Sequence, residues 1–91
     1  MLRRSLKLQK LVQPFIGDNN DMYWDIGQNK RVTLNEFKDN IYVHIRQYTE
    51  IEGKDYLIPT KKGIAMNKEQ FEELKSIMHS VDTALKEKLN K

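Results

Sequence analysis

The fold is decided by residues 31–49, whose sequence is RVTLNEFKDNIYVHIRQYT. Apolar and polar side chains alternate on both sides of a central Lys-Asp pair, a pattern typical of a β-hairpin with one buried face. The face expected to be buried carries Val32, Leu34, Ile41, Val43 and Ile45. The opposite face carries Arg31, Thr33, Tyr42, His44, Arg46 and Tyr48, with Phe37 at the end of the first strand.

Two further strands are predicted to flank this hairpin. Residues 22–26 are short and rich in aromatic side chains, and residues 56–66 return after a turn at 52–55. Pro59 and Gly63 interrupt the returning strand, which indicates irregular pairing or a place at a sheet edge. The sequence therefore predicts a four-stranded antiparallel sheet.

The last part of the chain is predicted to be one long helix, which makes the fold class α+β. Asn67 is a favourable N-cap, and Gln70 stands three residues later, as a capping box requires. Apolar residues then recur at spacings of three and four, as expected for one buried helix face. They are Phe71, Leu74, Ile77, Met78, Val81, Leu85 and Leu89.

The length of this helix predicts a homodimer. A segment of about 23 residues extends for about 35 Å, whereas a sheet of four short strands is only about 20 Å across. The surplus apolar stripe would form a large exposed patch on a monomer. We therefore expect an isologous dimer with antiparallel C-terminal helices. Its interface is expected to include Ile77, Val81, Leu85 and Leu89.

Residues 1–20 are predicted to be a basic arm in front of a single domain at residues 21–91. The arm holds four basic residues and one acidic residue, while the rest of the chain is neutral overall. Bulk charge is therefore weak support for nucleic-acid binding. A disordered or docked arm, a mitochondrial transit peptide and a membrane-surface helix all fit residues 1–20. No stretch approaches the length of a membrane span, and we expect no membrane partner.

Nothing in the sequence indicates catalysis, a metal site or a cofactor. His44 and His79 are isolated, and the chain has no cysteine. The stretch Lys61-Lys62-Gly63 lacks the upstream glycine and the following Ser or Thr of a phosphate-binding loop. We therefore predict that the protein is not an enzyme.

The polar face of the sheet favours nucleic acid over other ligands by a small margin. Aromatic rings can stack on bases at about 1–3 kcal/mol each, while Lys and Arg follow the phosphates. Tyr42 and Tyr48 could equally pack against neighbouring strands. Phe37, beside a turn and followed by Lys38, is the better stacking candidate. On pattern alone, a protein-interaction module remains almost as good an interpretation.

Four stretches of this sequence carry a family resemblance, namely Tyr23-Trp24-Asp25-Ile26-Gly27, the run from Arg31 to Lys38, Ile45-Arg46-Gln47-Tyr48, and the run from Lys61 to Phe71. Together they resemble the positive cofactor four family of transcriptional coactivators. The resemblance covers about residues 21–89. It implies a curved four-stranded sheet followed by a kinked helix, in a dimer that binds single-stranded or melted DNA. It also implies a role in RNA polymerase II coactivation or in protecting melted DNA, contacts with polymerase or general transcription factors, and a nuclear location. The basic N-terminus leaves location in an organelle as the alternative.

The resemblance also implies site residues. Phe37 would stack on bases, and the phosphates would be contacted by Lys38, Arg46, Lys61, Lys62 and, before the second strand, Lys30. Thr49 stands where the family has a second stacking residue, a Trp, and Tyr48 or Tyr56 could replace that ring. Polar residues replace common cations at Gln28, Asn35 and Asn40. Weaker binding with a shallower salt dependence is expected. The alternative is an interaction module with the same fold and little DNA affinity.

Overall fold

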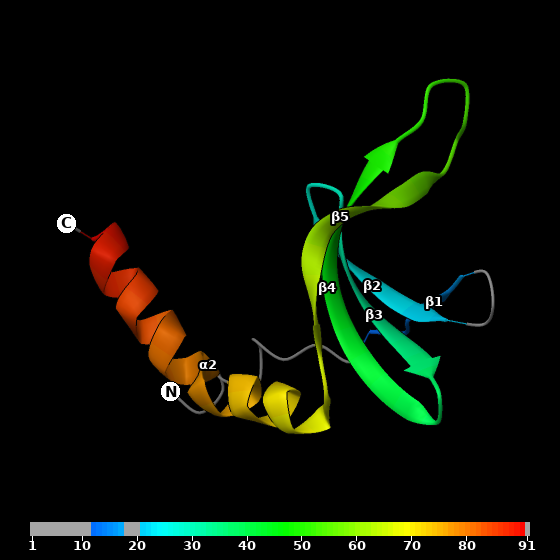
Figure 1. Ribbon diagram of the computed structural model, residues 1–91. Coiled ribbons are helices and arrows are strands. Elements are labelled where there is room, and N and C mark those ends of the chain that lie inside the picture. Colours follow the sequence, from blue (N-terminus) through cyan, green and yellow to red (C-terminus); the bar gives the residue numbers. More distant parts are fainter. Residues whose placement is uncertain (1–11, 18–20, 91) are drawn as a thin grey trace.

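The computed structural model describes residues 12–17 and 21–90 and contains one antiparallel sheet followed by one helix (Figure 1). The sheet is a meander in the order β1-β2-β3-β4-β5. Its strands are β1 (Phe15–Ile16), β2 (Met22–Gly27), β3 (Lys30–Phe37), β4 (Asn40–Glu50) and β5 (Leu57–Met66), and the helix is α2 (Lys68–Leu89). The expected α+β class and strand meander are thus confirmed, and Figure 1 shows the long strands β4 and β5 as strongly curved.

The prediction of four strands was wrong, because the sheet has a fifth strand inside the segment expected to be an arm. In β1, Phe15 pairs with Tyr23 and Ile16 pairs with Met22. The Phe15 and Tyr23 rings stack with centroids 5.3 Å apart. Trp24 Nε1 also donates a hydrogen bond to the Val12 carbonyl oxygen at 3.1 Å. These contacts dock residues 12–17 against β2, whereas residues 1–11 and 18–20 of the predicted arm lie outside the described residues.

The register of β3 and β4 confirms the two predicted faces. Val32 is opposite Ile45 and Leu34 is opposite Val43, while Arg31 is opposite Arg46. Lys38 and Asp39 form the turn between the strands, with φ of 53° and 67°. Positive φ at both central residues is the conformation of a tight hairpin turn whose twist matches the strands. This turn fixes Phe37 at the end of β3, on the polar face.

The pairing of β4 with β5 is interrupted by a bulge. Arg46 is opposite Gly63, but Tyr48 is opposite Pro59, so two steps along β4 correspond to four along β5. The extra residues of β5 increase the local bend of the sheet. At Gly63 a Cβ atom would lie 2.8 Å from the Ile45 carbonyl oxygen. A side chain is therefore excluded where β5 approaches β4.

Gly63→Ala should consequently lower the free energy of unfolding by about 1–3 kcal/mol, the usual cost of forcing atoms into a packed site. Urea denaturation at fixed protein concentration measures the change. Gly17→Ala is the control, because its Cβ would lie at ordinary contact distances, 3.6 Å from the Tyr23 ring and 3.8 Å from the Asp21 carbonyl oxygen. Equal stability of the two variants would contradict the close approach at Gly63.

The helix begins at the cap that its sequence predicts, and it bends as the family resemblance implies. The Asn67 side chain accepts a hydrogen bond from the Gln70 backbone, and the Gln70 side chain accepts one from the Asn67 backbone. Figure 1 shows α2 changing direction as it runs away from the sheet. Ser76 Oγ donates to the Glu73 carbonyl oxygen at 2.7 Å, and such back-bonding often bends helices.

The described part of a single chain buries very little apolar surface. Its buried residues are Val43, Met66 and the polar Thr33, and α2 buries none. The residues expected at a dimer interface are 48–72% exposed, namely Ile77, Val81, Leu85 and Leu89. No helix among the described residues is long and apolar enough to cross a membrane.

Candidate nucleic-acid interface

Phe37 and Lys38 lie together at the β3–β4 turn. Phe37 is 62% exposed, and the Lys38 Nζ atom lies 5.3 Å from the centre of its ring. Beside the ring is an open apolar cavity of about 420 Å³ lined by Asn35, Glu36, Phe37, Tyr42, His44 and Ala65. An exposed ring with a cation over it and an apolar hollow beside it can hold a flat aromatic group and an adjoining anion.

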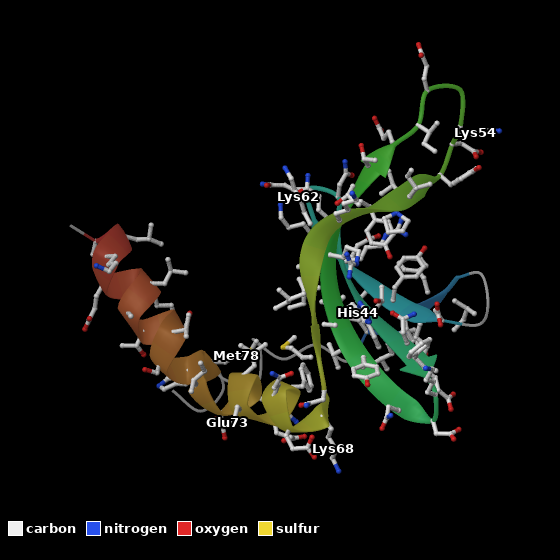
Figure 2. All side chains as sticks on the ribbon, viewed as in Figure 1. His44, Lys54, Lys62, Lys68, Glu73 and Met78 are labelled. Atoms are coloured by element: carbon white, nitrogen blue, oxygen red, sulfur yellow. The ribbon has the colours of Figure 1, made fainter. Side chains whose placement is uncertain are left out.

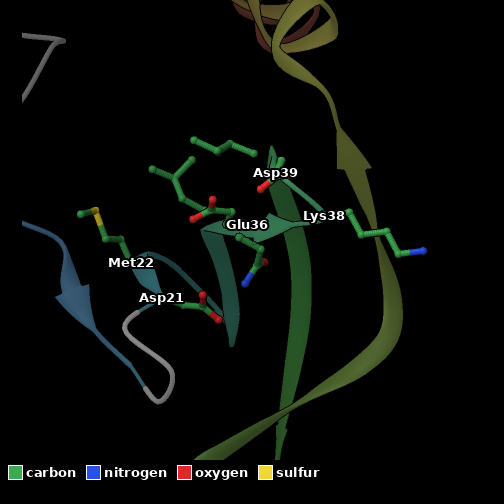
Figure 3. Close-up of a pocket in the computed structure, with 8 residues that line it drawn as sticks. Asp21, Met22, Glu36, Lys38 and Asp39 are labelled. Atoms are coloured by element: carbon green, nitrogen blue, oxygen red, sulfur yellow. The ribbon is translucent and has the colours of Figure 1, made fainter.

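The acidic side chains near this turn lie on the side of β2. A second open cavity, shown in Figure 3, is lined by Asp21, Met22, Leu34, Asn35, Glu36, Lys38, Asp39 and Ile41. In Figure 3 the Lys38 side chain points away from Asp21 and Glu36. Three carboxylates line this cavity, so it is unsuited to a phosphate. The Lys38 ammonium points away from Asp21 and Glu36 and can bind a phosphate outside the cavity.

Arg46 is partly engaged in holding the bulge. Its Nη1 donates to the Thr60 carbonyl oxygen at 3.0 Å, and its Nη2 lies 3.4 Å from His44 Nδ1. Burial lowers the pKa of His44 below its ordinary value, and the Arg46 charge lowers that pKa further, against a smaller opposite effect of Asp21. Near neutral pH, His44 is therefore uncharged, and the cation at this point of the polar face is Arg46.

Lys30, Lys61 and Lys62 lie at the other end of the sheet from Phe37. Lys30 is opposite Gln47 at one end of the β3–β4 pairing, while Phe37 is opposite Asn40 at the other. Seven residues of strand separate the two ends by about 23 Å. Lys61 and Lys62 are exposed on the bulged part of β5, and Figure 2 shows Lys62 projecting there. The predicted cations thus divide between two ends of the sheet.

A third group of side chains on the polar face was missed by sequence reasoning. The Arg31 guanidinium carbon lies 4.2 Å from the centre of the Tyr23 ring and 4.6 Å from that of Tyr48. Arg31 Nε also donates to Asp25 Oδ1 at 2.9 Å. With Phe15 stacked on Tyr23, these side chains form a continuous stack across four strands, Phe15–Tyr23–Arg31–Tyr48, called here the aromatic stack. Tyr48, predicted to contact DNA, therefore has one ring face covered by Arg31.

No group of three or more potential metal ligands occurs among residues 12–17 and 21–90.

Thr49 is exposed at the end of β4, opposite Ile58, and Tyr56 is 55% exposed before β5. The structure thus brings Phe37 and Lys38 together and places Lys30, Lys61 and Lys62 at the far end of the sheet.

Comparison with known proteins identifies the family. Residues 24–77 match the family described as Transcriptional Coactivator p15 (PC4). The RNA polymerase II transcriptional coactivator KELP of Arabidopsis thaliana is 38% identical over 67% of this chain and 36% of its own length. The RNA polymerase II transcriptional coactivator SUB1 of Saccharomyces cerevisiae is 33% identical over 72% of this chain and 23% of its own length. The chain thus spans about a third or less of these two relatives.

Solved structures show the same fold. A crystal structure of a MoSub1–single-stranded DNA complex superposes with a TM-score of 0.74 at 22% identity, covering 88% of this chain and 94% of that one. A second MoSub1–DNA complex gives 0.72 at 23% identity, covering 81% and 92%. The antiparallel sheet followed by a single C-terminal helix defines the fold that this chain shares with these DNA-bound proteins. This chain belongs to the positive cofactor four (PC4) family of transcriptional coactivators. Its members are non-enzymatic DNA-binding coactivators, which confirms that the chain is not an enzyme.

Proposed function

We propose that this protein is a homodimer that binds single-stranded or melted DNA without sequence preference and acts in the nucleus as a transcriptional coactivator or as a protector of melted DNA. The observation that carries the proposal is Phe37, 62% exposed on the open polar face with the Lys38 ammonium beside its ring. More than half of this residue is left exposed by the other described residues. A stacked base would cover part of that surface. RNA polymerase and general transcription factors are the proposed protein partners.

The homodimer is supported by the exposed stripe of α2. Its 22 residues extend for about 33 Å, and its outer half carries apolar side chains that no other described residue covers. A chain this short buries a modest fraction of its surface, so dimerisation would enlarge its core. A second copy with its helix antiparallel would cover the stripe on both chains at once.

A protein-interaction module with little DNA affinity is the second candidate. The Thr49 position offers no ring, and Asp25 neutralises Arg31 on the polar face. The first feature removes a stacking site for a base, and the second reduces the positive charge available to the phosphates. Capture of transcription proteins without any oligonucleotide binding would favour this candidate.

Titration of a fluorescent oligo-dT of about 20 nucleotides tests the proposal, since it offers a strand long enough for a typical single-strand site. Anisotropy should rise on binding, and the affinity should fall as salt is added. Lys61→Ala combined with Lys62→Ala should make the slope of log K against log salt shallower by about 1.4, because each lost phosphate contact to a single strand contributes about 0.7.

The matched control is Lys86→Ala combined with Lys88→Ala, which removes the same charge from the last turn of α2. Its slope should remain that of the wild-type protein. The absence of any salt-sensitive anisotropy change in the wild-type protein would overturn the proposed function. An equal change of slope in both double variants would instead show that net charge, rather than the β5 bulge, attracts the strand.

A further inference from the structure

The aromatic stack on the polar face has one exposed end. Tyr23 is enclosed, with Phe15 on one side at 5.3 Å and Arg31 on the other at 4.2 Å. Arg31 is enclosed in turn between Tyr23 and Tyr48. Tyr48 is half-buried, whereas Phe15 is 56% exposed. The ring available for another stacked group is therefore Phe15.

Phe15 occupies the same face of the sheet as Phe37. Phe15 is opposite Tyr23, Tyr23 is opposite Thr33, and Phe37 lies four residues beyond Thr33 on β3. Even-numbered steps along a strand keep side chains on one face. Two strand spacings across the sheet and four residues along it put the two positions about 16 Å apart. A few nucleotides of an extended strand cover that distance.

The charges around the stack favour a base over a phosphate. The Arg31 guanidinium is paired with Asp25 at 2.9 Å. Asp21 lines one cavity beside the stack and Asp55 lines another, which also includes Tyr23 and Arg31. A phosphate would meet these carboxylates, whereas a neutral flat base meets a ring whose stack is held in place by the cation.

We propose that Phe15 is a second base-stacking residue of this protein, supplied by β1 and compensating for the ring missing at Thr49. The inference rests on the proposed function, because it requires a bound single strand. Phe15 lies outside residues 24–77, the part of the chain that matches the family. The β1 strand thus extends the interface to a fifth strand and adds a nucleobase site with little net positive charge.

Phe15→Ala should weaken binding of the fluorescent oligo-dT about 5- to 100-fold, the range of one lost base stack. The slope of log K against log salt should stay unchanged, because no phosphate contact is lost. Phe15→Leu should weaken binding similarly, since it keeps apolar packing against Tyr23 but has no ring, and Phe15→Trp should restore binding. An oligonucleotide that carries iodinated deoxyuridine should become cross-linked to Phe15 when its complex with the protein is irradiated.

The control is Ile16→Ala, which removes a side chain of similar exposure, 59%, from the opposite face of the same strand. It should bind as the wild-type protein does. If the wild-type protein binds but Phe15→Ala and Ile16→Ala have equal affinity, the inference is overturned while the proposed function stands. If Phe15→Leu binds as tightly as the wild-type protein, packing rather than stacking explains the residue, and the inference also fails. If the wild-type protein does not bind at all, the proposed function fails and the inference fails with it.

Discussion

Val81→Asp should convert the protein from a dimer to a monomer at micromolar concentration and lower its thermal midpoint strongly. Val81 is 55% exposed in the middle of the apolar stripe of α2. In the proposed dimer its side chain becomes buried, which contributes about 1.5–3 kcal/mol per chain. An aspartate there would instead bury an unpaired charge, at a cost of several kcal/mol. Both copies carry the change, so the effect counts twice in each dimer.

Light scattering during size-exclusion chromatography measures the mass directly. Thr83→Asp is the control, because it adds the same charge two residues further on. At 3.6 residues per turn, that position is on the opposite side of the helix from the apolar stripe. The control should remain a dimer. A wild-type protein that is monomeric at micromolar concentration, or a Val81→Asp variant that stays dimeric, would contradict the antiparallel-helix dimer.

Side-chain orientation in β3 and β4 could be predicted from the sequence because a strand has a period of two. A slip of one residue would exchange the faces and expose Val43, so the alternation itself specifies the register. The same argument places Phe37 on the polar face. The start of the helix could also be predicted, because it depends on local contacts only. Asn67 and Gln70 form reciprocal side-chain-to-backbone hydrogen bonds within a single turn.

The features that the sequence did not reveal depend on non-local contacts. A strand of two residues is too short for any periodicity, so Phe15 and Ile16 are recognisable only through their pairing with β2. The position of Arg31 between two tyrosines depends on the register shift in β2 after Asp25. Pro59 and Gly63 indicated irregular pairing, but not that Arg46 would bond to the Thr60 carbonyl oxygen. Residues of the polar face could therefore be predicted, but not the contacts among them.

Phe37→Ala should weaken the binding of single-stranded DNA about 5- to 100-fold, the range expected for one lost base stack, without changing the dimer. The ring is 62% exposed, so its removal leaves the buried residues untouched. Anisotropy titration with oligo-dT measures the affinity, and light scattering checks the mass. The salt dependence should separate this residue from its neighbour, because Phe37→Ala keeps the wild-type slope and Lys38→Ala makes it shallower by about 0.7.

Ile41→Ala provides the matched control for Phe37→Ala. Ile41 is 61% exposed and lies near the same turn, opposite Glu36 and therefore on the other face of the sheet. A loss of affinity shared by both variants would report a general disturbance of the turn. A loss confined to Phe37→Ala would instead assign the affinity to the ring. Wild-type affinity in Phe37→Ala would contradict the stacking role of this ring, which the proposed function depends on because no other described ring is both as exposed and accompanied by a lysine on the polar face.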